Sequence, residues 1–408
     1  MTYGLIGEKL GHSFSPEIHA CIGNYPYHLK ELVPDAVAPF LERREFTAIN
    51  VTIPYKETVI PFCDEIDEAA RAIGAVNTIV NRGGKLYGYN TDFAGLQALI
   101  AHTGVDPKGK KALILGTGGT CKTAVAVLKA MDAAEIVIAG RTPRAGVIGY
   151  DALPPDAEIL INTTPCGMYP HIDGMAADPA DFPNLLAVID VVYNPLRTDL
   201  LQKAQKLGIP HCGGMLMLAT QAIRAAEHFF DITIDVSRSK QIVKQVENRK
   251  TNIVLIGMPA SGKTSVGRAI AKALGRPFVD ADEELVKTVG RSIPAIFEHE
   301  GEDTFRQYET QTIRALSGRN GCVIATGGGV ILNAENIRYL KKNGRVYFLD
   351  RSPELLVPTA DRPTASSMEA MQSRYQERYP IYLKTCDRHI CADGDIESVA
   401  AQIIEDYI

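Results

Sequence analysis

A strand–loop–helix pattern beyond the middle of the chain constrains its fold more than any other feature. The loop reads GMPASGKT over Gly257–Thr264, follows the apolar run Asn252–Ile256 and precedes a helical pattern over Ser265–Leu274. In such a loop the backbone amides turn toward phosphate oxygens at a helix N-terminus, and the lysine reaches the terminal phosphates. The pattern therefore predicts a P-loop NTPase-type α/β domain. The residues expected to bind its nucleotide are Gly257, Gly262, Lys263 and Thr264.

Length and charge narrow the class of protein. A chain of 408 residues is long enough for two or three domains. The net charge of −5 disfavours non-specific binding to nucleic acid or to an anionic membrane. We find no apolar run long enough for a membrane span, and the first residues lack the pattern of a secretory signal. Eight scattered cysteines without a C-x-x-C pair fit a reducing cytosol, so we expect a cytoplasmic protein.

The chain divides into successive α/β segments. Between Lys111 and Ile209 apolar runs alternate with turn signals and helical stretches, which is typical of βαβ units and a parallel sheet. We predict one α/β domain over residues 1–101 and a Rossmann-type domain over 102–237, with a helix near 214–230 returning to the first domain. The charged, amphipathic segment 238–250 is predicted to be a linker, and 251–408 to be the P-loop domain.

A second glycine-rich loop follows the apolar run Ala112–Leu115. Its sequence is Gly116-Thr-Gly118-Gly119, and it leads into a helical stretch, as in loops that bind a dinucleotide pyrophosphate. Taken alone, this spacing also occurs in ordinary tight turns. The next strand, Glu135–Ala139, ends in a region that holds two arginines and a threonine where an NAD site would place a carboxylate. Arginine suits a 2′-phosphate, so NADP(H) is favoured, although surface arginines after a strand are common. The three side chains are those of Arg141, Thr142 and Arg144.

The first 230 residues resemble the shikimate dehydrogenase family. The resemblance rests on motifs that occur in family order over nearly the whole segment. They are GHSFSP at 11–16, NVTIPYKE at 50–57, GAVNT at 74–78, NTD at 90–92, NPLRT at 194–198 and a G-x-x-M-L-x-x-Q pattern at 214–221. The resemblance implies NADPH-dependent reduction of 3-dehydroshikimate to shikimate.

The same resemblance implies roles for individual residues. Ketone reduction needs a hydride donor and an acid near the developing alkoxide. Lys56, with Asp92 as its orienting partner, is the implied catalytic pair. Without the resemblance, Ser13 and Asp92 could each be a helix cap, and Lys56 a solvated side chain. The implied substrate ligands are Ser13 and Ser15 for the carboxylate, and Thr52, Asn77 and Gln221 for the ring hydroxyls.

One segment departs from the family pattern. Only about 20 residues separate Arg141 from Ile161, where the family places a longer, helix-containing stretch. We expect a crossover helix to be shortened or lost. This change would alter how the protein binds the adenosine half of the cofactor and its preference between cofactors.

The C-terminal segment resembles the shikimate kinase family over its full length. The run Phe278–Asp282 is predicted to be a strand that carries Asp280 and Asp282 on one side, since side chains alternate along a strand. The resemblance implies that Asp282 acts as base toward the acceptor hydroxyl, and that Asp280 and Thr264 hold Mg²⁺. The remaining implied ligands are Arg306, Gly328, Gly329 and Arg378 for the substrate, and Arg362 of a lid for ATP. The lid departs from the family, with Thr364-Ala365 in place of leucines.

These resemblances together predict a bifunctional enzyme that makes shikimate 3-phosphate in chorismate and aromatic amino-acid biosynthesis. Its cofactors would be NADP(H), ATP and Mg²⁺, and its partners small-molecule substrates. One alternative is a dehydrogenase whose kinase-like module only regulates. Another is a dehydrogenase that acts on quinate with NAD. A P-loop switch protein is a third, although no N-K-x-D motif is present. The sequence leaves the oligomeric state open.

Overall fold

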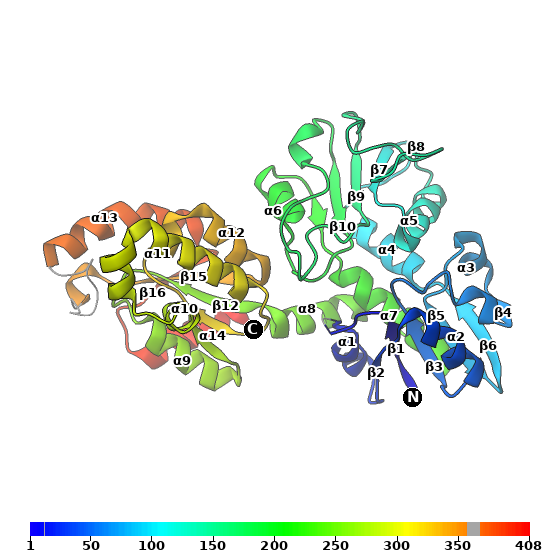
Figure 1. Ribbon diagram of the computed structural model, residues 1–408, viewed down its shortest axis with the longest axis horizontal. Coiled ribbons are helices and arrows are strands. Elements are labelled where there is room, and N and C mark those ends of the chain that lie inside the picture. The colour runs from blue at the N-terminus through cyan, green and yellow to red at the C-terminus, as the bar shows by residue number, and fades with distance from the viewer. Residues whose placement is uncertain (12, 357–367) are drawn as a thin grey trace. The chain divides into compact units, whose positions relative to one another are not determined.

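The computed structural model describes residues 1–11, 13–356 and 368–408. The chain forms two compact units, Met1–Val246 and Glu247–Ile408. Figure 1 shows both, and each is described by itself below. Within the described residues no helix is long and apolar enough to cross a membrane.

The first unit opens with a six-stranded mixed sheet. Its strand order is β2-β1-β3-β5-β6-β4, with parallel pairing at the β1 side and antiparallel pairing of β5 with β3 and β6. The strands are β1 (Tyr3–Gly7), β2 (His28–Glu31), β3 (Ala48–Val51), β4 (Glu65–Ile66), β5 (Thr78–Arg82) and β6 (Lys85–Tyr89). The helices of this part are α1 (Ser15–Ile22), α2 (Pro34–Arg43) and α3 (Glu68–Ile73). Every residue of β3 is buried, because helix α2 packs on one face of the sheet and helix α7 on the other.

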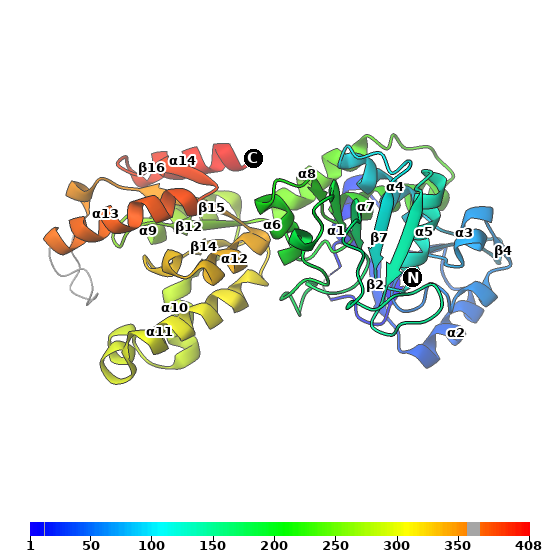
Figure 2. The same cartoon turned by 90° about the horizontal axis from the view of Figure 1, so that it is seen from above.

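A second, fully parallel sheet follows in the same unit. Its order is β11-β10-β9-β7-β8. The strands are β7 (Lys111–Leu115), β8 (Glu135–Ala139), β9 (Ile159–Asn162), β10 (Ala187–Asp190) and β11 (His211–Cys212). The helices are α4 (Asp92–His102), α5 (Gly119–Ala130), α6 (Asp199–Lys206) and α7 (Met215–Phe230). Helices α4, α5 and α7 share a core with one face of this sheet, and α6 packs on the other; Figure 2 shows α4 and α5 alongside β7.

Helix α7 returns the chain to the first sheet. Its N-terminal residues Leu216 and Met217 belong to the core of the second sheet, whereas Ala225 and Phe229 pack on the first. The Rossmann-type sheet agrees with the predicted fold class, and α7 links the cores of the two sheets.

The segment between β8 and β9 contains no helix. Instead the chain makes a small turn between Arg144 and Val147, and Ile148 forms a single parallel bridge with Ala139. Strand β8 is consequently an edge strand, with Ile136, Val137 and Ile138 only half-buried. The loss of a crossover helix predicted for this segment is confirmed.

The second unit is a five-stranded parallel sheet of order β13-β14-β12-β15-β16. The strands are β12 (Asn252–Ile256), β13 (Phe278–Asp280), β14 (Val323–Ala325), β15 (Gly344–Asp350) and β16 (Arg388–Cys391). The helices are α9 (Lys263–Leu274), α10 (Ala281–Val289), α11 (Ile293–Ser317), α12 (Ala334–Asn343), α13 (Met368–Thr385) and α14 (Ile396–Tyr407). Helices α9 and α14 cover one face of the sheet, as Figure 1 shows. The central strand β12 is buried along its whole length.

Helix α8 (Arg238–Lys250) occupies the predicted linker. Its residues Ile242 and Val246 are buried in the first unit against α1 and α7. The carbonyls of Asn248 and Lys250 accept hydrogen bonds from residues of the second unit. Most of this segment is therefore packed structure rather than a free connector.

Candidate active sites

The predicted catalytic pair is assembled in the first unit. The Lys56 Nζ and Asp92 Oδ2 atoms are 2.6 Å apart, and the side chains are only 14% and 8% exposed. Lys56 lies in the turn that follows β3, and Asp92 is the first residue of α4. The ammonium of Lys56 and the buried carboxylate of Asp92 thus form a short, charge-assisted hydrogen bond. This arrangement can present a proton to a bound ketone oxygen.

Asp92 does not cap its own helix. The carboxylate points to Lys56, and the backbone N–H of Phe93 donates instead to Asn90 Oδ1, at 3.3 Å. The N-cap residue, Thr91, makes no side-chain capping bond. The interpretation of Asp92 as a helix cap is therefore not supported by the geometry.

A chain of polar side chains extends from the residue before Asp92. Asn77 Nδ2 donates to Thr91 Oγ1 at 3.0 Å, and Thr91 N donates to Asn77 Oδ1 at 2.8 Å. Thr91 Oγ1 also donates to Gln221 Oε1 at 3.5 Å, so α7 joins the group. The structure brings Asn77 and Gln221 together beside the Lys56–Asp92 pair. Thr52, which follows β3, is half-buried next to Gly7.

Two serines and a tyrosine meet at the start of α1. Ser13 Oγ donates to Ser15 Oγ at 3.1 Å and accepts a bond from Ser15 N at 3.3 Å. The second of these bonds is local, because the N-cap of α1 is Phe14 and the helix has no side-chain capping bond. The interpretation of Ser13 as a helix cap is therefore not supported by the geometry. Tyr193 also hydrogen-bonds Ser13, while burial raises the pKa of its phenol and so keeps it neutral. Three hydroxyls gathered in this way suit a carboxylate.

The glycine loop after β7 opens into a large cavity of about 920 Å³. A Cβ on Gly118 would meet nothing within 4 Å, whereas one on Gly119 would lie 3.8 Å from Lys56 Cδ. Gly116, with φ of +109°, passes so close to Thr163 that a Cβ would lie 2.7 Å from Oγ1. The loop thus leaves open space at the N-terminus of α5 and approaches Lys56, as expected of a pyrophosphate-binding turn beside a reductase site.

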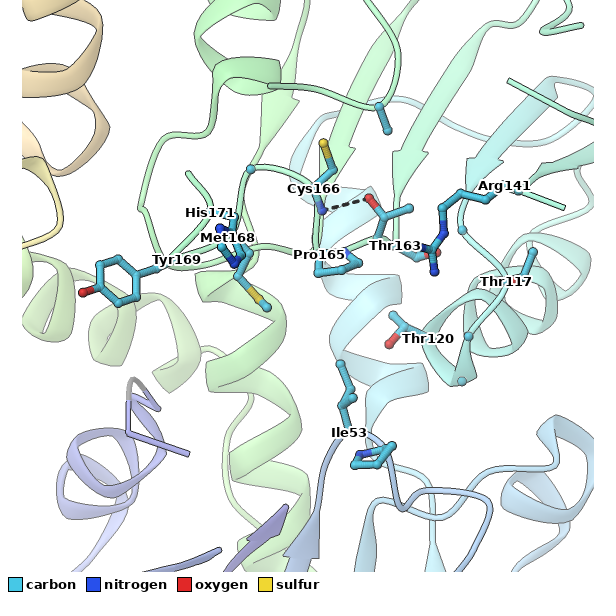
Figure 3. A pocket seen from close by; sticks show the side chains of 18 of the residues that line it. Ile53, Thr117, Thr120, Arg141, Thr163, Pro165, Cys166, Met168, Tyr169 and His171 are labelled. Atoms are coloured by element: carbon cyan, nitrogen blue, oxygen red, sulfur yellow. Dashed lines mark hydrogen bonds between the residues drawn. The ribbon is translucent and has the colours of Figure 1, made fainter. Parts of the chain in front are cut away.

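Side chains from both subdomains of the first unit line this cavity. Figure 3 shows Ile53 on one side, and Thr117, Thr120, Arg141 and Thr163 around the loop. The lining continues along Pro165, Cys166, Met168, Tyr169 and His171. Arg141 is part of the wall, and Thr142 and Arg144 lie outside it. The cavity can therefore hold NADP(H) with Arg141 at the end of β8, where a 2′-phosphate would be bound.

The P-loop of the second unit has the predicted form. Gly257 and Gly262 take φ values of +152° and +90°, which favour glycine, and α9 begins at Lys263. Lys263 Nζ donates to the carbonyls of Gly257 at 3.0 Å and Met258 at 2.7 Å. The lysine is thus folded over its own loop and is 6% exposed.

Thr264 and Asp280, which the sequence predicts to hold Mg²⁺, lie side by side. Thr264 Oγ1 donates to Asp280 Oδ2 at 2.9 Å. A hydroxyl and a carboxylate beside a phosphate loop are the oxygen donors that Mg²⁺ takes in such sites. Among the described residues no group of three His, Cys, Asp or Glu side chains is arranged to hold a metal ion. The pair therefore fits an ion that water and the nucleotide would also coordinate.

The prediction that Asp280 and Asp282 share one strand is wrong. Strand β13 ends at Asp280, whose Oδ1 accepts bonds from Asp282 N and Glu283 N and so caps α10. A capping carboxylate starts a helix, and strand alternation no longer applies to Asp282. Asp282 lies in the first helical turn, with Oδ1 2.8 Å from the position of a Cβ on Gly327. The two carboxylates still belong to one region of the site.

Arg306 is fixed against the glycines that follow β14. Its guanidinium pairs with Glu309 at 3.1 Å and with Glu302 at 2.9 Å. Burial opposes its charge, but these carboxylates outweigh that effect and raise the pKa of Arg306 above its ordinary value. A Cβ on Gly329 would lie 2.4 Å from Arg306 Nη1, so the arginine lies flat over this glycine. The permanent cation suits a substrate carboxylate.

Arg378 approaches the same glycines from α13. Arg378 Nη1 donates to the carbonyl of Gly328 at 3.2 Å, and Tyr382 Oη donates to the same carbonyl at 2.6 Å. Arg378 Nε is buried and has no hydrogen-bond partner among the described residues. Arg362 and the predicted lid residues Thr364 and Ala365 lie outside the described residues.

The sequence analysis missed some residues of these sites. Thr91 and Tyr193 were not assigned roles, although each stands inside or next to a quoted motif. Tyr382, four residues after the predicted ligand Arg378, was also not assigned a role. The signal that could have identified these three residues is a hydroxyl side chain within or close to a recognised motif.

Comparisons with known proteins agree with this geometry. Residues 5–79 match the family model "Shikimate dehydrogenase substrate binding domain", and residues 259–407 match the model "Shikimate kinase". A shikimate dehydrogenase (NADP(+)) of Clostridium perfringens is 36% identical over 267 residues, which cover 60% of this chain and 98% of that protein. One of Halothermothrix orenii is 40% identical over 255 residues, 54% of this chain and 88% of that protein.

Solved structures match the same part of the chain. The crystal structure of shikimate dehydrogenase 1 from Peptoclostridium difficile has a TM-score of 0.56 at 33% identity and covers 60% of this chain and 98% of that one. Shikimate 5-dehydrogenase from Thermus thermophilus, in complex with NADP(H) and shikimate, has a TM-score of 0.53 at 30% identity and covers 60% and 99%.

Proposed function

The chain belongs to the shikimate dehydrogenase family and carries a shikimate kinase domain. From this premise we propose that it catalyses two consecutive reactions, the second of which uses the product of the first. The first unit reduces 3-dehydroshikimate to shikimate with NADPH. The second phosphorylates shikimate from Mg-ATP to give shikimate 3-phosphate. The observation that carries the first assignment is the buried Lys56–Asp92 pair, which lies against the dinucleotide loop.

We propose the following division of work in the reductase site. NADPH, when bound in the cavity, would supply the hydride for the carbonyl carbon. Lys56 gives a proton to the oxygen, and Asp92 holds the ammonium in place and stabilises its charge. Ser13 and Ser15, assisted by Tyr193, bind the carboxylate, while Thr52, Asn77 and Gln221 bind ring hydroxyls. Gly116, Gly118 and Gly119 bind the pyrophosphate.

Cofactor selectivity rests on the end of β8. We propose that Arg141 binds the 2′-phosphate, with Thr142 and Arg144 as secondary contacts. The support is the position of Arg141 in the cavity wall. Activity with NADH equal to that with NADPH would overturn this assignment.

The kinase site uses a separate set of groups. Asp282 accepts the proton of the attacking hydroxyl, and the oxygen then bonds to the γ-phosphorus as ADP leaves. Arg306 and Arg378 bind the carboxylate, and the backbone of Gly328 and Gly329 approaches the ring. Lys263 leaves the loop carbonyls to bind the phosphates. Thr264 and Asp280 hold Mg²⁺, and we keep Arg362 as a proposed ATP ligand.

We also propose that the enzyme is cytoplasmic, because its eight cysteines are scattered along the sequence and are free thiols in the structure.

One assay tests both halves. Purified protein is given 3-dehydroshikimate, NADPH, ATP and Mg²⁺, and the products are followed by mass spectrometry. We expect shikimate 3-phosphate without any added enzyme. Accumulation of shikimate would mean that the kinase half is inactive or regulatory. Lys56→Met should stop the first step and Asp282→Asn the second, so each variant is the control for the other.

A further inference from the structure

An arginine beside the P-loop has no role in the assignments above. Arg351 directly follows β15, which pairs in parallel with the P-loop strand β12. The carboxyl ends of parallel strands meet at one sheet edge, and that edge holds the P-loop here. Gly257, the first loop residue, lies so close to β15 that a Cβ on it would be 2.6 Å from the Leu349 carbonyl oxygen.

The guanidinium of Arg351 reaches the last glycine of the loop. A Cβ on Gly262 would lie 4.0 Å from Arg351 Nη1. Gly262 precedes Lys263, and the amides of this part of a P-loop bind the α- and β-phosphates of a nucleotide. The arginine is therefore within reach of the place where those phosphates are bound.

Arg351 is not engaged by the carboxylates around it. Asp350 accepts bonds from Tyr375 Oη and His389 Nε2. Asp393 accepts two bonds from Ser352, and Arg351 acts on it only as a nearby charge that helps to lower its pKa. Within the described part of the chain no ion pair is formed by Arg351, and its Nε is buried without a hydrogen-bond partner.

A buried guanidinium nitrogen without a partner carries a cost that an anion would remove. An arginine fork matches the oxygens of a phosphate in two parallel bonds. The neighbouring loop is itself an anion site, so the charge and the geometry agree.

We propose that Arg351 is a nucleotide-binding residue of the kinase unit that contacts the diphosphate part of ATP and ADP. This inference rests on the proposed kinase function. The binding of ADP would engage Arg351 together with the P-loop amides and Lys263. Shikimate, held by Arg306 and Arg378, would not depend on it.

The test compares Arg351→Gln with wild type in the full chain. We expect the KM for ATP and the Kd for ADP, measured by calorimetry, to rise at least tenfold, with the KM for shikimate within twofold of wild type. Arg351→Lys should fall between the two, because it keeps the charge and loses the fork. Arg345→Gln is the matched control, since Arg345 lies on β15, the strand that precedes Arg351, and its side chain bonds Asp406. It should leave ADP binding unchanged.

Other outcomes separate the two proposals. Unchanged ADP binding by Arg351→Gln would overturn the role of Arg351. A rise in the KM for shikimate equal to that for ATP would also overturn it. A thermal melting curve of the kinase unit like that of wild type excludes misfolding, and Arg351→Lys keeps the test open if the glutamine variant does not fold. A wild-type protein that binds ADP but transfers no phosphate would refute the kinase function and leave the ADP test of Arg351 in place.

Discussion

At the scale of single residues, the Lys56–Asp92 pair gives the sharpest expectation. Lys56→Met removes the ammonium that donates the proton but keeps the length of the side chain. Loss of one acid–base group lowers a rate by about 10²–10⁴-fold. We expect such a loss in the dehydrogenase kcat with a smaller change in KM, measured by NADPH oxidation. The kinase rate of the same sample is an internal control, and Lys85→Met, on an exposed position of β6, should keep full activity.

Gly329 provides a second prediction, which separates binding from stability. The φ of Gly329 is −97°, so alanine is tolerated by the backbone. The methyl group of an alanine at position 329 would lie 2.4 Å from Arg306 Nη1. The guanidinium is the end of a flexible side chain, so Arg306 can move away from this methyl group. Gly329→Ala should therefore leave kinase-unit stability within about 0.5 kcal/mol of wild type, as surface changes do. The KM for shikimate in the kinase assay should rise by about 10–100-fold, the equivalent of one charge-assisted bond.

The control for this variant is Gly394→Ala. A Cβ at Gly394 would meet Ser398 Cβ at 3.9 Å, an ordinary contact. Kinase kinetics of Gly394→Ala should match wild type. A Gly329→Ala enzyme with normal shikimate affinity would show that Arg306 does not bind the substrate in the position described.

His19 gives the dehydrogenase unit a dependence on pH. The side chain is fully buried, Nδ1 hydrogen-bonds Tyr25 Oη at 2.5 Å, and burial lowers the pKa from 6.5 to about 3, against a smaller opposing effect of Asn50. The unfolded chain binds a proton near pH 6.5 and the folded chain does not, so stability falls as the pH drops below 6.5. Between pH 7 and pH 5 the loss is about 2 kcal/mol.

This loss can be measured from heat inactivation of the dehydrogenase. Between pH 7 and pH 5 the wild-type midpoint should fall by about 4–8 °C more than that of His19→Gln, which cannot take up the proton. His28→Gln, at an exposed position on β2, should follow wild type. Equal pH dependence of wild type and His19→Gln would contradict the assignment.

At the scale of elements, Asp280 makes two contacts whose roles substitutions can separate. One carboxylate oxygen caps α10 and the other accepts the Thr264 hydroxyl. Asparagine caps helices about as well as aspartate, whereas alanine loses about 1 kcal/mol. Asp280→Asn should therefore keep stability but raise the Mg²⁺ concentration for half-maximal kinase activity, and Asp280→Ala should change both. Thermal melting and Mg²⁺ titrations check this; a normal Mg²⁺ requirement in both variants would exclude Asp280 from the metal site.

The elements also show what the sequence could and could not predict. Strand β8 was predicted at its observed bounds, Glu135–Ala139, because apolar runs between turn signals are a local pattern. The end of β13 was missed, since a capping aspartate and a strand aspartate look alike until the next helix is placed. Arg351 was not predicted as a site residue, because its position beside Gly262 results from strand pairing between residues far apart in the sequence.

The loss of the crossover helix after β8 could be predicted from the length of the segment alone. Its effect on the positions of Arg141 and Arg144 could not. The structure places Arg141 in the cavity wall and Arg144 outside it, because the segment turns back at Arg144–Val147 instead of entering a helix. One of the two predicted arginines therefore carries the proposed contact with the 2′-phosphate.

At the scale of the whole molecule, the chain joins its two units through a helix that belongs to both. The unit boundary falls between Val246 and Glu247, inside α8 and not at either end of the predicted linker 238–250. Ile242 and Val246 are buried with residues of the first unit. In the second unit the Asn248 carbonyl accepts bonds from Arg276 and Tyr407, and the Lys250 carbonyl accepts one from Gly321 N.

This division predicts how fragments will behave. A dehydrogenase fragment 1–237 loses the burial of Ile242 and Val246, worth about 1.5–3 kcal/mol each, and leaves their neighbours exposed. Its heat-inactivation midpoint should lie roughly 6 °C or more below that of fragment 1–250. A kinase fragment 252–408 lacks the two carbonyl acceptors and should melt below fragment 247–408, because Arg276 and Tyr407 lose partners in a half-buried position. Equal midpoints within each pair would show that α8 is a linker without a structural role, as the sequence alone had predicted. The outcome described here would instead make α8 part of both folds, so that neither enzyme can be cut from the other at 237 or 251 without loss.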